Sequence, residues 1–331
     1  TPEAKPEGPE REAFVADLKA GRRFYGGAAY EASRSEEEKA AFRYALHETM
    51  DLWYAHEGTT VYMLTRLPEG TQRKAGYDES GWTTYERRSA EQIKKFHLWN
   101  AAWTLVLDLG ASRGTSGGNW TPKERSRNWP LDPDGFDALI ESKQFTNGAD
   151  KGAVKALYRK MSEGQLGSVR KLDFLFMQKP TVRDMEQCGR CLSLCRRLQV
   201  CSFFEVGLTD ETCAALFSTL ATDAHIEVLY LGGNQLGPAA AKEIAAYLCG
   251  NHSLEILYLQ RNNLGDEGAK ALAPAISASM SLKAILVDDN NLSDEGFAAI
   301  HRAAVHGERD IALIGGVGNA ASNLLGALMK R

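Results

Sequence analysis

The chain has 331 residues, of which 44% are hydrophobic and 25% are charged, and this composition is typical of a soluble globular protein. The net charge of −4 gives no reason to expect nucleic acid or acidic lipid as a partner, and no apolar run is long enough for a membrane span. The length predicts two domains. We place a disordered tail over 1–10, one domain over 11–164 and a second over 165–331.

The first domain alternates helices with apolar strands. After the Pro/Glu-rich tail, Ser35-Glu-Glu-Glu38 is a capping box that begins a helix predicted to reach about His56. Buried strands are predicted over 59–65 and 103–109, a Gly/Ser loop over 110–119, and further helices over 134–141 and 151–161. Helices alternating with buried strands predict an α/β domain with a parallel sheet, of the flavodoxin type.

The only pattern in this domain that suggests catalysis is Ser80-x-Trp82-x-x-x-Glu86, which follows the first strand and begins a helix. The pattern resembles the S-x-W-C-x-x-E motif of Toll/interleukin-1 receptor (TIR) domains, with Thr83 in place of the Cys. The resemblance covers about residues 40–110. It implies that Glu86 would cleave the nicotinamide–ribose bond of NAD, with Trp82 lining the pocket and NAD as a substrate. A carboxylate can stabilise the oxocarbenium-like centre that this reaction forms.

The same residues also have a structural interpretation. Glu86 in the first turn of a helix is favoured by the helix dipole, and Trp82 would be a core residue. The loop 110–119 matches neither G-x-x-x-x-G-K-[ST] nor G-x-G-x-x-G, so no nucleotide-binding ATPase module is predicted. We therefore expect a TIR-like domain without activity and without a cofactor, and an NAD-cleaving hydrolase is the alternative.

The six cysteines all lie in the second domain, and Cys188, Cys191 and Cys195 suggest a metal or iron–sulfur site. Their i, i+3, i+7 spacing puts them on one helix face, where free cysteines are usually buried, so we predict no metal. Reduced thiols favour a reducing, cytosol-like compartment. The first residue is Thr, which we interpret as a processed N-terminus that has lost any targeting sequence.

The second domain contains a repeated pattern. Three equally spaced segments (254 − 226 = 282 − 254) fit L-x-x-L-x-L-x-x-N-x-L: Ile226 to Leu236, Leu254 to Leu264 and Leu282 to Leu292. This pattern, at a period of about 28 residues, is the leucine-rich repeat signature. The repeat length, with a full helix in each unit, resembles the ribonuclease-inhibitor class of these proteins. The fold class expected for the chain is therefore an α/β domain followed by a short solenoid of βα units.

Each unit should consist of a short strand, a turn and a helix. The Asn of each turn (Asn234, Asn262 and Asn290) should bond the backbone of the neighbouring coil. Small residues recur in the helices at Ala240, Gly268 and Gly296, where we expect helix and strand to approach closely, and large ones recur four positions later at Ile244, Leu272 and Ile300. One unit cannot bury its own apolar face, so several must stack.

Weaker repeats extend the array towards the N-terminus. Leu198, Cys201 and Phe203 fit the frame, and we align Leu172, Leu175 and Met177 with them, which sets Leu172 against Leu198 (198 − 172 = 26). This gives about five repeats from Leu172 to His306. A capping strand over 311–314 and a closing helix over 320–330 complete the domain.

Side chains that alternate with the core positions should lie on the concave face of the solenoid. They form apolar and aromatic columns, in which Phe174 stands in the first column. The predicted partner-binding residues are Phe176, Phe204, Tyr230, Tyr258, Gln260, Leu286 and Asp288. We expect a protein partner there, and a role as a scaffold or adaptor in a larger assembly. The alternative is that the first domain or the C-terminal tail folds over this face.

Overall fold

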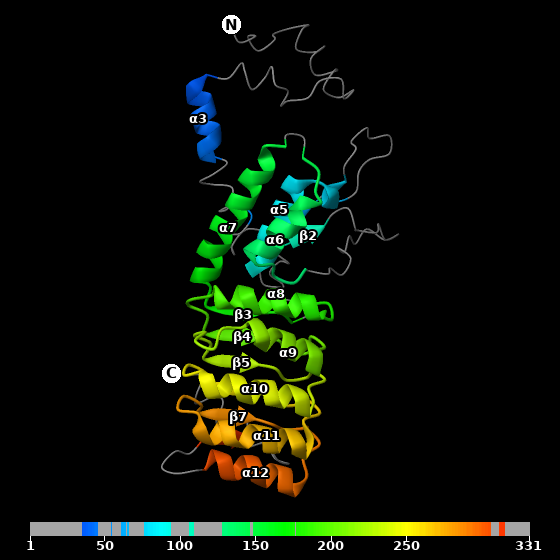
Figure 1. The fold of residues 1–331 in the computed structure, drawn as a ribbon, viewed down its shortest axis with the longest axis vertical. Helices are drawn as coiled ribbons and strands as arrows, with labels where there is room; N and C mark the ends of the chain where they lie inside the picture. The colour runs from blue at the N-terminus through cyan, green and yellow to red at the C-terminus, as the bar shows by residue number, and fades with distance from the viewer. Residues whose placement is uncertain are drawn as a thin grey trace, which may run out of the picture.

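The computed structural model describes residues 35–45, 54, 61–63, 65, 76–93, 106–108, 128–145, 148–175, 177–305 and 311–314. Their elements are drawn in Figure 1 and follow in chain order: α3 Glu36–Tyr44, β1 Val61–Met63, η2 Tyr77–Glu79, α5 Gly81–Ile93, β2 Val106–Asp108, α6 Pro133–Glu141, α7 Asp150–Ser168, β3 Lys171–Asp173, α8 Val182–Ser193, β4 Val200–Ser202, α9 Asp210–Thr219, β5 Val228–Tyr230, α10 Pro238–Gly250, β6 Ile256–Tyr258, α11 Gly265–Ala278, β7 Ala284–Leu286, α12 Asp294–Ala304 and β8 Ala312–Ile314. The predicted tail 1–10, the loop 110–119, Phe176 and the closing helix 320–330 lie outside the described residues.

The region before β3 has the predicted elements where it is described. The capping box at the start of α3 is formed, because Glu38 N–H donates to Ser35 Oγ and Ser35 N–H donates to a Glu38 carboxylate oxygen. Strands β1 and β2 lie within the two predicted strand segments and pair in parallel, with Val61 opposite Val106. The predicted helix after Ser80 is α5, and the two later ones are α6 and α7.

Helices α5, α6 and α7 share an aromatic core. Tyr85 of α5, Phe136 of α6 and Tyr158 of α7 are buried together, and the rings of Phe136 and Tyr158 stack with centroids 3.7 Å apart. The N-cap of α6 is Asp132, whose side chain accepts from Gly135 N–H and also pairs with Arg190 of α8 at 3.1 Å. Asp132 therefore connects α6 to α8, the first helix of the repeats.

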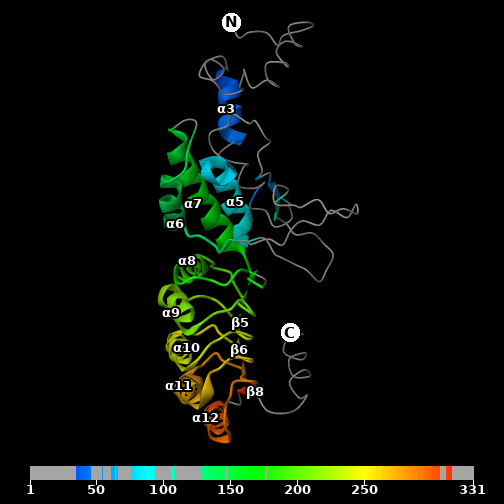
Figure 2. The same ribbon diagram turned by 90° about the vertical axis from the view of Figure 1, so that its right-hand side faces the viewer.

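The region from β3 to β8 is a stack of βα units. Strands β3 to β8 form one six-stranded parallel sheet in sequence order. From β4 onward each strand residue pairs with its equivalent in the next repeat, as in Leu229 opposite Leu257 and Leu257 opposite Ile285. The period read from the sequence is therefore the register of the sheet. Helices α8 to α12 all lie on the same side of the sheet, which Figure 2 shows in profile.

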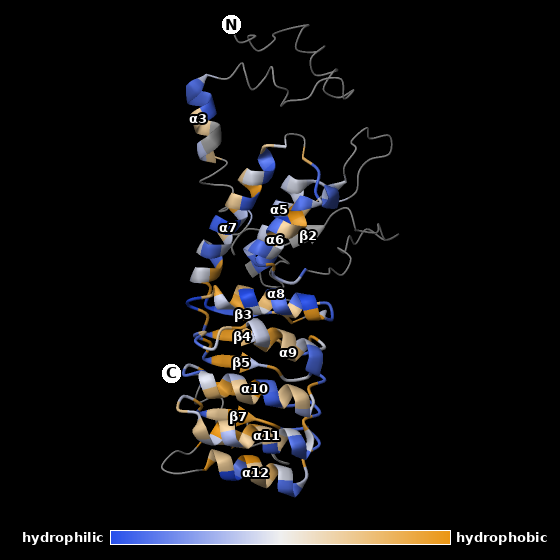
Figure 3. Cartoon of the chain, viewed as in Figure 1, coloured by the Kyte–Doolittle hydropathy of each residue, from blue (hydrophilic) through white to orange (hydrophobic). Residues whose placement is uncertain are grey.

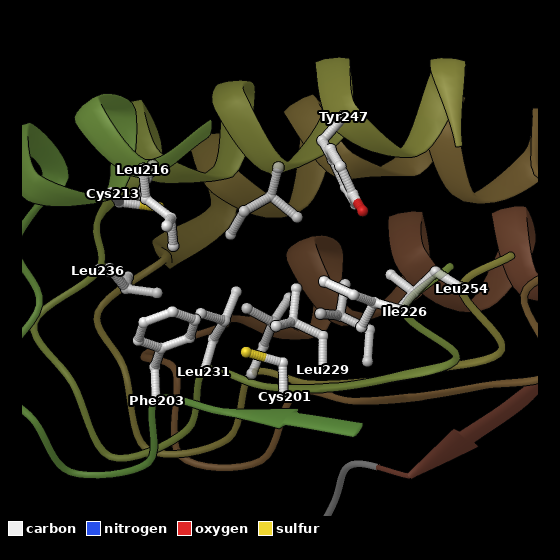
Figure 4. Packing of buried hydrophobic residues seen from close by; sticks show 14 of the residues in the cluster. Cys201, Phe203, Cys213, Leu216, Ile226, Leu229, Leu231, Leu236, Tyr247 and Leu254 are labelled. Atoms are coloured by element: carbon white, nitrogen blue, oxygen red, sulfur yellow. The ribbon is translucent and has the colours of Figure 1, made fainter. Parts of the chain in front are cut away.

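The core lies between this sheet and the helices. The apolar strands β4, β5 and β7 are orange in Figure 3, whereas the helices alternate between apolar and polar residues. Figure 4 shows side chains of the strand segments, such as Phe203 and Leu231, meeting Leu216 and Tyr247 of the helices. The predicted large positions of the helices are buried, with Ile244, Leu272 and Ile300 at most 1% exposed.

The asparagines of the turns bond to the preceding coil, as predicted. Asn234 Oδ1 accepts from Gly207 N–H at 2.9 Å and Leu208 N–H at 3.0 Å, and its amide donates to Phe203 O and Leu231 O. Asn262 makes the equivalent hydrogen bonds one coil later. Its Oδ1 accepts from the N–H of Leu236, and its amide donates to Leu231 O and Leu259 O. Asn290 does the same in the next coil. These bonds satisfy backbone groups that a turn would otherwise leave unpaired.

The recurring small residues serve a different contact from the one we expected. A Cβ at Gly268 would lie 3.3 Å from Ala241 Cβ in α10, and one at Gly296 would overlap Asp266 Oδ1 in α11. These positions therefore bring neighbouring helices together, not helix and strand. Gly296 leaves room for the Asp266 side chain, which accepts a hydrogen bond of 2.8 Å from the N–H of Ser293, the N-cap of α12.

The predicted alignment of the first repeat is wrong by three positions. Leu172 pairs with Cys201 (201 − 172 = 29), and not with Leu198. This register places Phe174 in the core with no exposed surface, so it does not belong to the concave column. Its ring stacks on Phe203 with centroids 4.9 Å apart. The aromatic contact determines the register, because this repeat has no turn Asn.

Trp129 covers the end of the repeat core. Its ring lies against those of Phe174 and Phe203, with centroids 5.2 and 6.3 Å away, and its indole N–H donates to Gln178 O at 3.0 Å. Only 6% of Trp129 is exposed. A repeat array needs such a cap, since its terminal coil would otherwise expose its apolar side.

Candidate functional site

The face of the sheet opposite the helices, which we call the concave face, carries two columns of side chains in register. The first column is Lys171, Val200, Val228, Ile256, Ala284 and Ala312, and the second is Asp173, Ser202, Tyr230, Tyr258 and Leu286. At β3 both columns are charged, with Lys171 and Asp173, and at β4 they hold the apolar Val200 and the polar Ser202. From β5 onward both columns are apolar or aromatic, so the charged residues of this face lie at its β3 end.

Seven of these residues, which we call the apolar stripe, pack together: Val228, Tyr230, Ile256, Tyr258, Ala284, Leu286 and Ala312. The rings of Tyr230 and Tyr258 stack with centroids 4.1 Å apart and an interplanar angle of 15°. Ile256, Tyr258, Ala284 and Leu286 are at most 7% exposed, whereas Val228 and Tyr230 are only half-buried. The stripe is therefore shielded within the chain over β6 and β7, and it is accessible at β5.

One polar atom beside the stripe, Gln260 Oε1, is buried without a hydrogen-bond partner among the residues that the structure describes. Burial also raises the pKa of the Tyr230 and Tyr258 phenols, so both stay protonated at neutral pH. An unsatisfied buried group costs about 1–3 kcal/mol.

The turns that follow the strands form a charged rim. Glu205, Arg261 and Asp289 occupy equivalent turn positions and have left-handed backbone angles, with φ between 53° and 59°. Glu205 extends across Gly233, the residue of the intervening repeat, and pairs with Arg261 at 2.6 Å. A Cβ at Gly233 would lie 2.5 Å from Glu205 Cγ, and its φ is +69°, so glycine is required there. This exposed ion pair joins Glu205 and Arg261 along the rim.

The structure distributes the predicted partner-binding residues over three environments. Phe204, Tyr230, Gln260 and Asp288 are half-buried, Tyr258 and Leu286 are buried, and Phe176 lies outside the described residues. Lys171 is exposed at the start of the first column, and our alignment missed it because it placed Phe174 there. The alternation of exposed Lys171, buried Leu172 and half-buried Asp173 is the signal that identifies the strand.

Glu86 lies in α5 beside two tyrosines and is half-buried. Tyr54 OH donates to its Oε1 at 3.0 Å. Loss of hydration raises the pKa of Glu86, and the Tyr54 hydrogen bond opposes that rise. Burial and the nearby carboxylate in turn raise the pKa of Tyr54 to about 12 and also raise that of Tyr77.

The arginines that follow Glu86 do not neutralise it. Arg87 pairs with Asp78 at 2.7 Å and with Glu91 at 3.0 Å, and Arg88 donates to Trp129 O at 3.4 Å. Within the described residues no cation pairs with Glu86, so the carboxylate is desolvated and has one phenol as its hydrogen-bond donor. Such a group is a candidate for acid–base chemistry.

Trp82 and Ser80 contact neighbours other than those of Glu86. The indole N–H of Trp82 donates to Asp150 at the start of α7 at 3.0 Å, and its ring packs on the aromatic core beside Tyr85. Ser80 forms a backbone bridge with Gln144, and its carbonyl accepts from the hydroxyl of Thr84. Trp82 therefore contacts α7, whereas Glu86 contacts Tyr54, and the two side chains share no contact among the described residues.

The three spaced cysteines lie on the inner side of α8 and the turn after it. Cys188, Cys191 and Cys195 are at most 3% exposed and belong to the repeat core, and burial raises the pKa of the Cys191 and Cys195 thiols. In the described parts of the chain, no cluster of three or more histidine, cysteine or acidic side chains is placed to hold a metal ion. The helical spacing therefore reflects packing.

The comparison with protein families supports the repeat assignment. The family model for the leucine-rich repeat matches residues 222–245 and 250–273, so this region of the chain consists of leucine-rich repeats. Among solved structures, the chain is similar to leiomodin-1 actin-binding site 2, with 14% identity and a TM-score of 0.37, over 46% of this chain and 90% of that one. It is also similar to the tropomodulin C-terminal domain of Caenorhabditis elegans, with 14% identity and a TM-score of 0.36, over 44% and 89% of the two chains.

No curated protein sequence matches the chain. Among the helices that the structure describes, each is too short or too polar to cross a bilayer.

Proposed function

We propose that the repeat domain is a protein-interaction module that binds a partner chain on the accessible end of its concave face, over β3, β4 and β5. The observation that carries this proposal is Tyr230, a half-buried aromatic residue at the open end of the apolar stripe, stacked on Tyr258. Tyrosine is enriched at the energetically dominant positions of protein interfaces, because it combines a large apolar surface with a polar tip.

The surface around Tyr230 suits such a partner. Val228 continues the apolar area, and Phe204 adds a second half-buried aromatic residue in the turn after β4. The partner would complete the burial of these residues. Asp288, which is half-buried, and the charged rim lie farther along the stack and would be reached by a longer ligand. A rigid surface of this kind fits a scaffold or adaptor in a larger assembly.

Site-specific photocrosslinking tests this proposal. A photoreactive phenylalanine analogue replaces Tyr230 in one variant and Lys242, exposed on α10, in a matched control. Both are irradiated in cells that express the chain. We expect one protein adduct that forms at position 230 and is absent at position 242. The same adducts at both positions, or none at 230 when the fold is intact by circular dichroism, would refute the concave face as the binding surface.

A second candidate function is cleavage of NAD by Glu86. The observation that favours it is the desolvated Glu86 carboxylate, which has no cationic partner among the described residues. The separate contacts of Trp82 and Glu86 make it the weaker proposal. Incubation of the chain with NAD, beside Glu86→Gln as a control that keeps an acceptor for Tyr54, is the test. Turnover that disappears in the variant would support it, and absence of turnover in both proteins would reject it.

A further inference from the structure

An open cavity of about 620 Å³ lies where the two domains join, between the last turns of α7 and the turn that leads from α8 to β4. Its lining comes from both sides: Lys160, Glu163, Gly164, Gly167, Ser168, Arg196 and Arg197. In Figure 1 the lower end of α7 lies beside β3 and α8. Three of the lining side chains are cationic and one is a carboxylate.

Two further cations extend this cavity towards the concave face. Arg170 and Lys171 follow α7 directly, and both are exposed. The carbonyl of Arg170 accepts from the N–H groups of Gln199 and Val200, so this segment lies beside the turn that carries Arg196 and Arg197. Lys171 is itself the first member of the first concave column. The cations thus extend from the cavity to the first strand of the concave face, two strands away from Tyr230.

The four cations nearest the turn have no acidic partner in the described parts of the chain. Other arginines of the same region are paired, since Arg159 contacts Asp134 and Asp137 and Arg190 contacts Asp132. Arg196, Arg197, Arg170 and Lys171 form no ion pair there. In a chain with a net charge of −4, a group of unpaired cations around a concavity is an attractive site for an anion.

We infer that this cationic cavity binds an acidic segment of a partner protein, in continuation of the concave face. The inference rests on the proposed function and specifies the chemistry of the partner, which carries carboxylate or phosphorylated side chains next to the part that contacts Tyr230. Guanidinium groups match both anions with paired N–H donors. The two arginines, adjacent in sequence on one turn, can bind neighbouring acidic side chains of an extended peptide.

The surroundings favour a peptide over other polyanions. The cationic surface is confined to one cavity and the adjoining strand, whereas a nucleic acid needs contacts that follow its phosphate backbone. The large apolar side chains that are exposed in the described chain are Tyr44, Val182, Met280 and Val305. None of them lines this cavity, so it lacks the apolar anchors that a membrane surface site would use.

Two features limit the strength of the site. Glu163 lines the same cavity, and the carboxyl end of α7 carries the negative end of its helix dipole. Asp173 stands two positions after Lys171, although its carboxylate accepts from Leu175 N–H. Binding should therefore be moderate in affinity and should weaken steeply as salt screens the exposed charges.

Fluorescence anisotropy of the full chain with a labelled oligoglutamate peptide tests this inference. The double variant R196E/R197E is compared with K242E, a charge reversal at an exposed lysine of α10. We expect the double variant to bind at least about tenfold more weakly, the K242E control to bind like the wild type, and added salt to weaken the wild type. Equal binding by all three proteins, or equal loss in both variants, would overturn the inference.

Three additional measurements distinguish a loss of the anion site from misfolding, from a different polyanion and from failure of the proposed function. R196Q/R197Q, which removes charge without reversing it, should show an intermediate loss if folding is intact. An oligonucleotide or an anionic vesicle that binds more tightly than the peptide would overturn the peptide assignment. If R196E/R197E leaves the Tyr230 crosslink of the proposed function unchanged, the acidic contact is refuted and the interaction module stands. If the peptide binds but position 230 forms no adduct, the proposed function fails while the anion site remains.

Discussion

Replacement of the turn asparagines should destabilise the repeat domain in a definite order, with Asn234→Ala more damaging than Asn262→Ala. Each side chain bonds the same kinds of backbone groups, but the groups left behind differ. Asn262→Ala strips Leu236 N–H of its acceptor. The two carbonyls that Asn262 serves keep other donors, since Leu231 O still accepts from Asn234 and Leu259 O still accepts from Asn290.

Asn234→Ala removes more. Gly207 N–H and Leu208 N–H both lose their acceptor, and Phe203 O loses a donor at 2.8 Å. At about 1–3 kcal/mol for each buried group left unpaired, we expect a loss of about 4 kcal/mol for Asn234→Ala and about 2 kcal/mol for Asn262→Ala. Asn263→Ala is the control, because this exposed side chain contacts only the exposed Asn291 across the turn. It should lie within about 0.5 kcal/mol of the wild type.

Urea unfolding followed by far-ultraviolet circular dichroism measures these differences. The slope of the free energy against urea should be unchanged, so that the midpoints report stability. Equal losses for Asn234→Ala and Asn262→Ala would refute the reasoning, because they would show that the number of orphaned N–H groups does not set the cost. A loss for Asn263→Ala as large as either would also contradict it.

Three further predictions follow from burial and close packing. Five of the six thiols are buried and Cys249 is exposed, so the native chain should react rapidly with Ellman's reagent at one thiol, Cys249→Ser should remove that phase, and denaturant should expose all the others. Burial raises the pKa of Glu86 above its usual 4.5, so ionisation of this carboxyl lowers the stability of the folded chain as pH rises from 4.5 through the native pKa. Glu86→Gln should therefore have a higher melting temperature than the wild type at pH 7, and the two should melt together below pH 4.5. A difference that is the same at both pH values would contradict this. Gly296→Ala should displace Asp266 from the N-cap of α12 and cost about 1–2 kcal/mol by urea unfolding, whereas Gly152→Ala, where a Cβ meets open space, should be neutral or stabilising.

The sequence predicts well those parts of the fold in which the same residue type makes the same contact in each repeat. The turn asparagines must bond backbone groups in the coil before them, so their constant spacing (262 − 234 = 290 − 262) is visible in the chain and equals the register of the strands. The first repeat lacks that residue. In its register Phe174 meets Phe203 and Trp129, and Trp129 lies 45 positions earlier in the chain (174 − 129 = 45), so local pattern could not reveal this contact.

The candidate site was predictable only in part. Alternation along the strands gives the members of the columns from β4 onward, including Tyr230 and Tyr258. Burial of Tyr258 and Leu286 depends on long-range packing over the strands, which alternation does not contain. The cationic cavity combines Lys160 of α7 with Arg196 and Arg197 of a later turn, so its lining becomes contiguous only in the folded chain.

The bonds of the turn asparagines have a consequence for how such a chain can change in length. Each asparagine recognises main-chain atoms of the coil before it, and main-chain atoms are the same whichever side chains that coil carries. The joints between β4 and β7 are therefore interchangeable. Removal or duplication of one complete repeat unit would regenerate an equivalent joint, while the aromatic cap at Trp129 stays in place. The array can thus grow or shorten by whole units, and the reach of its binding surface can change without redesign of the core.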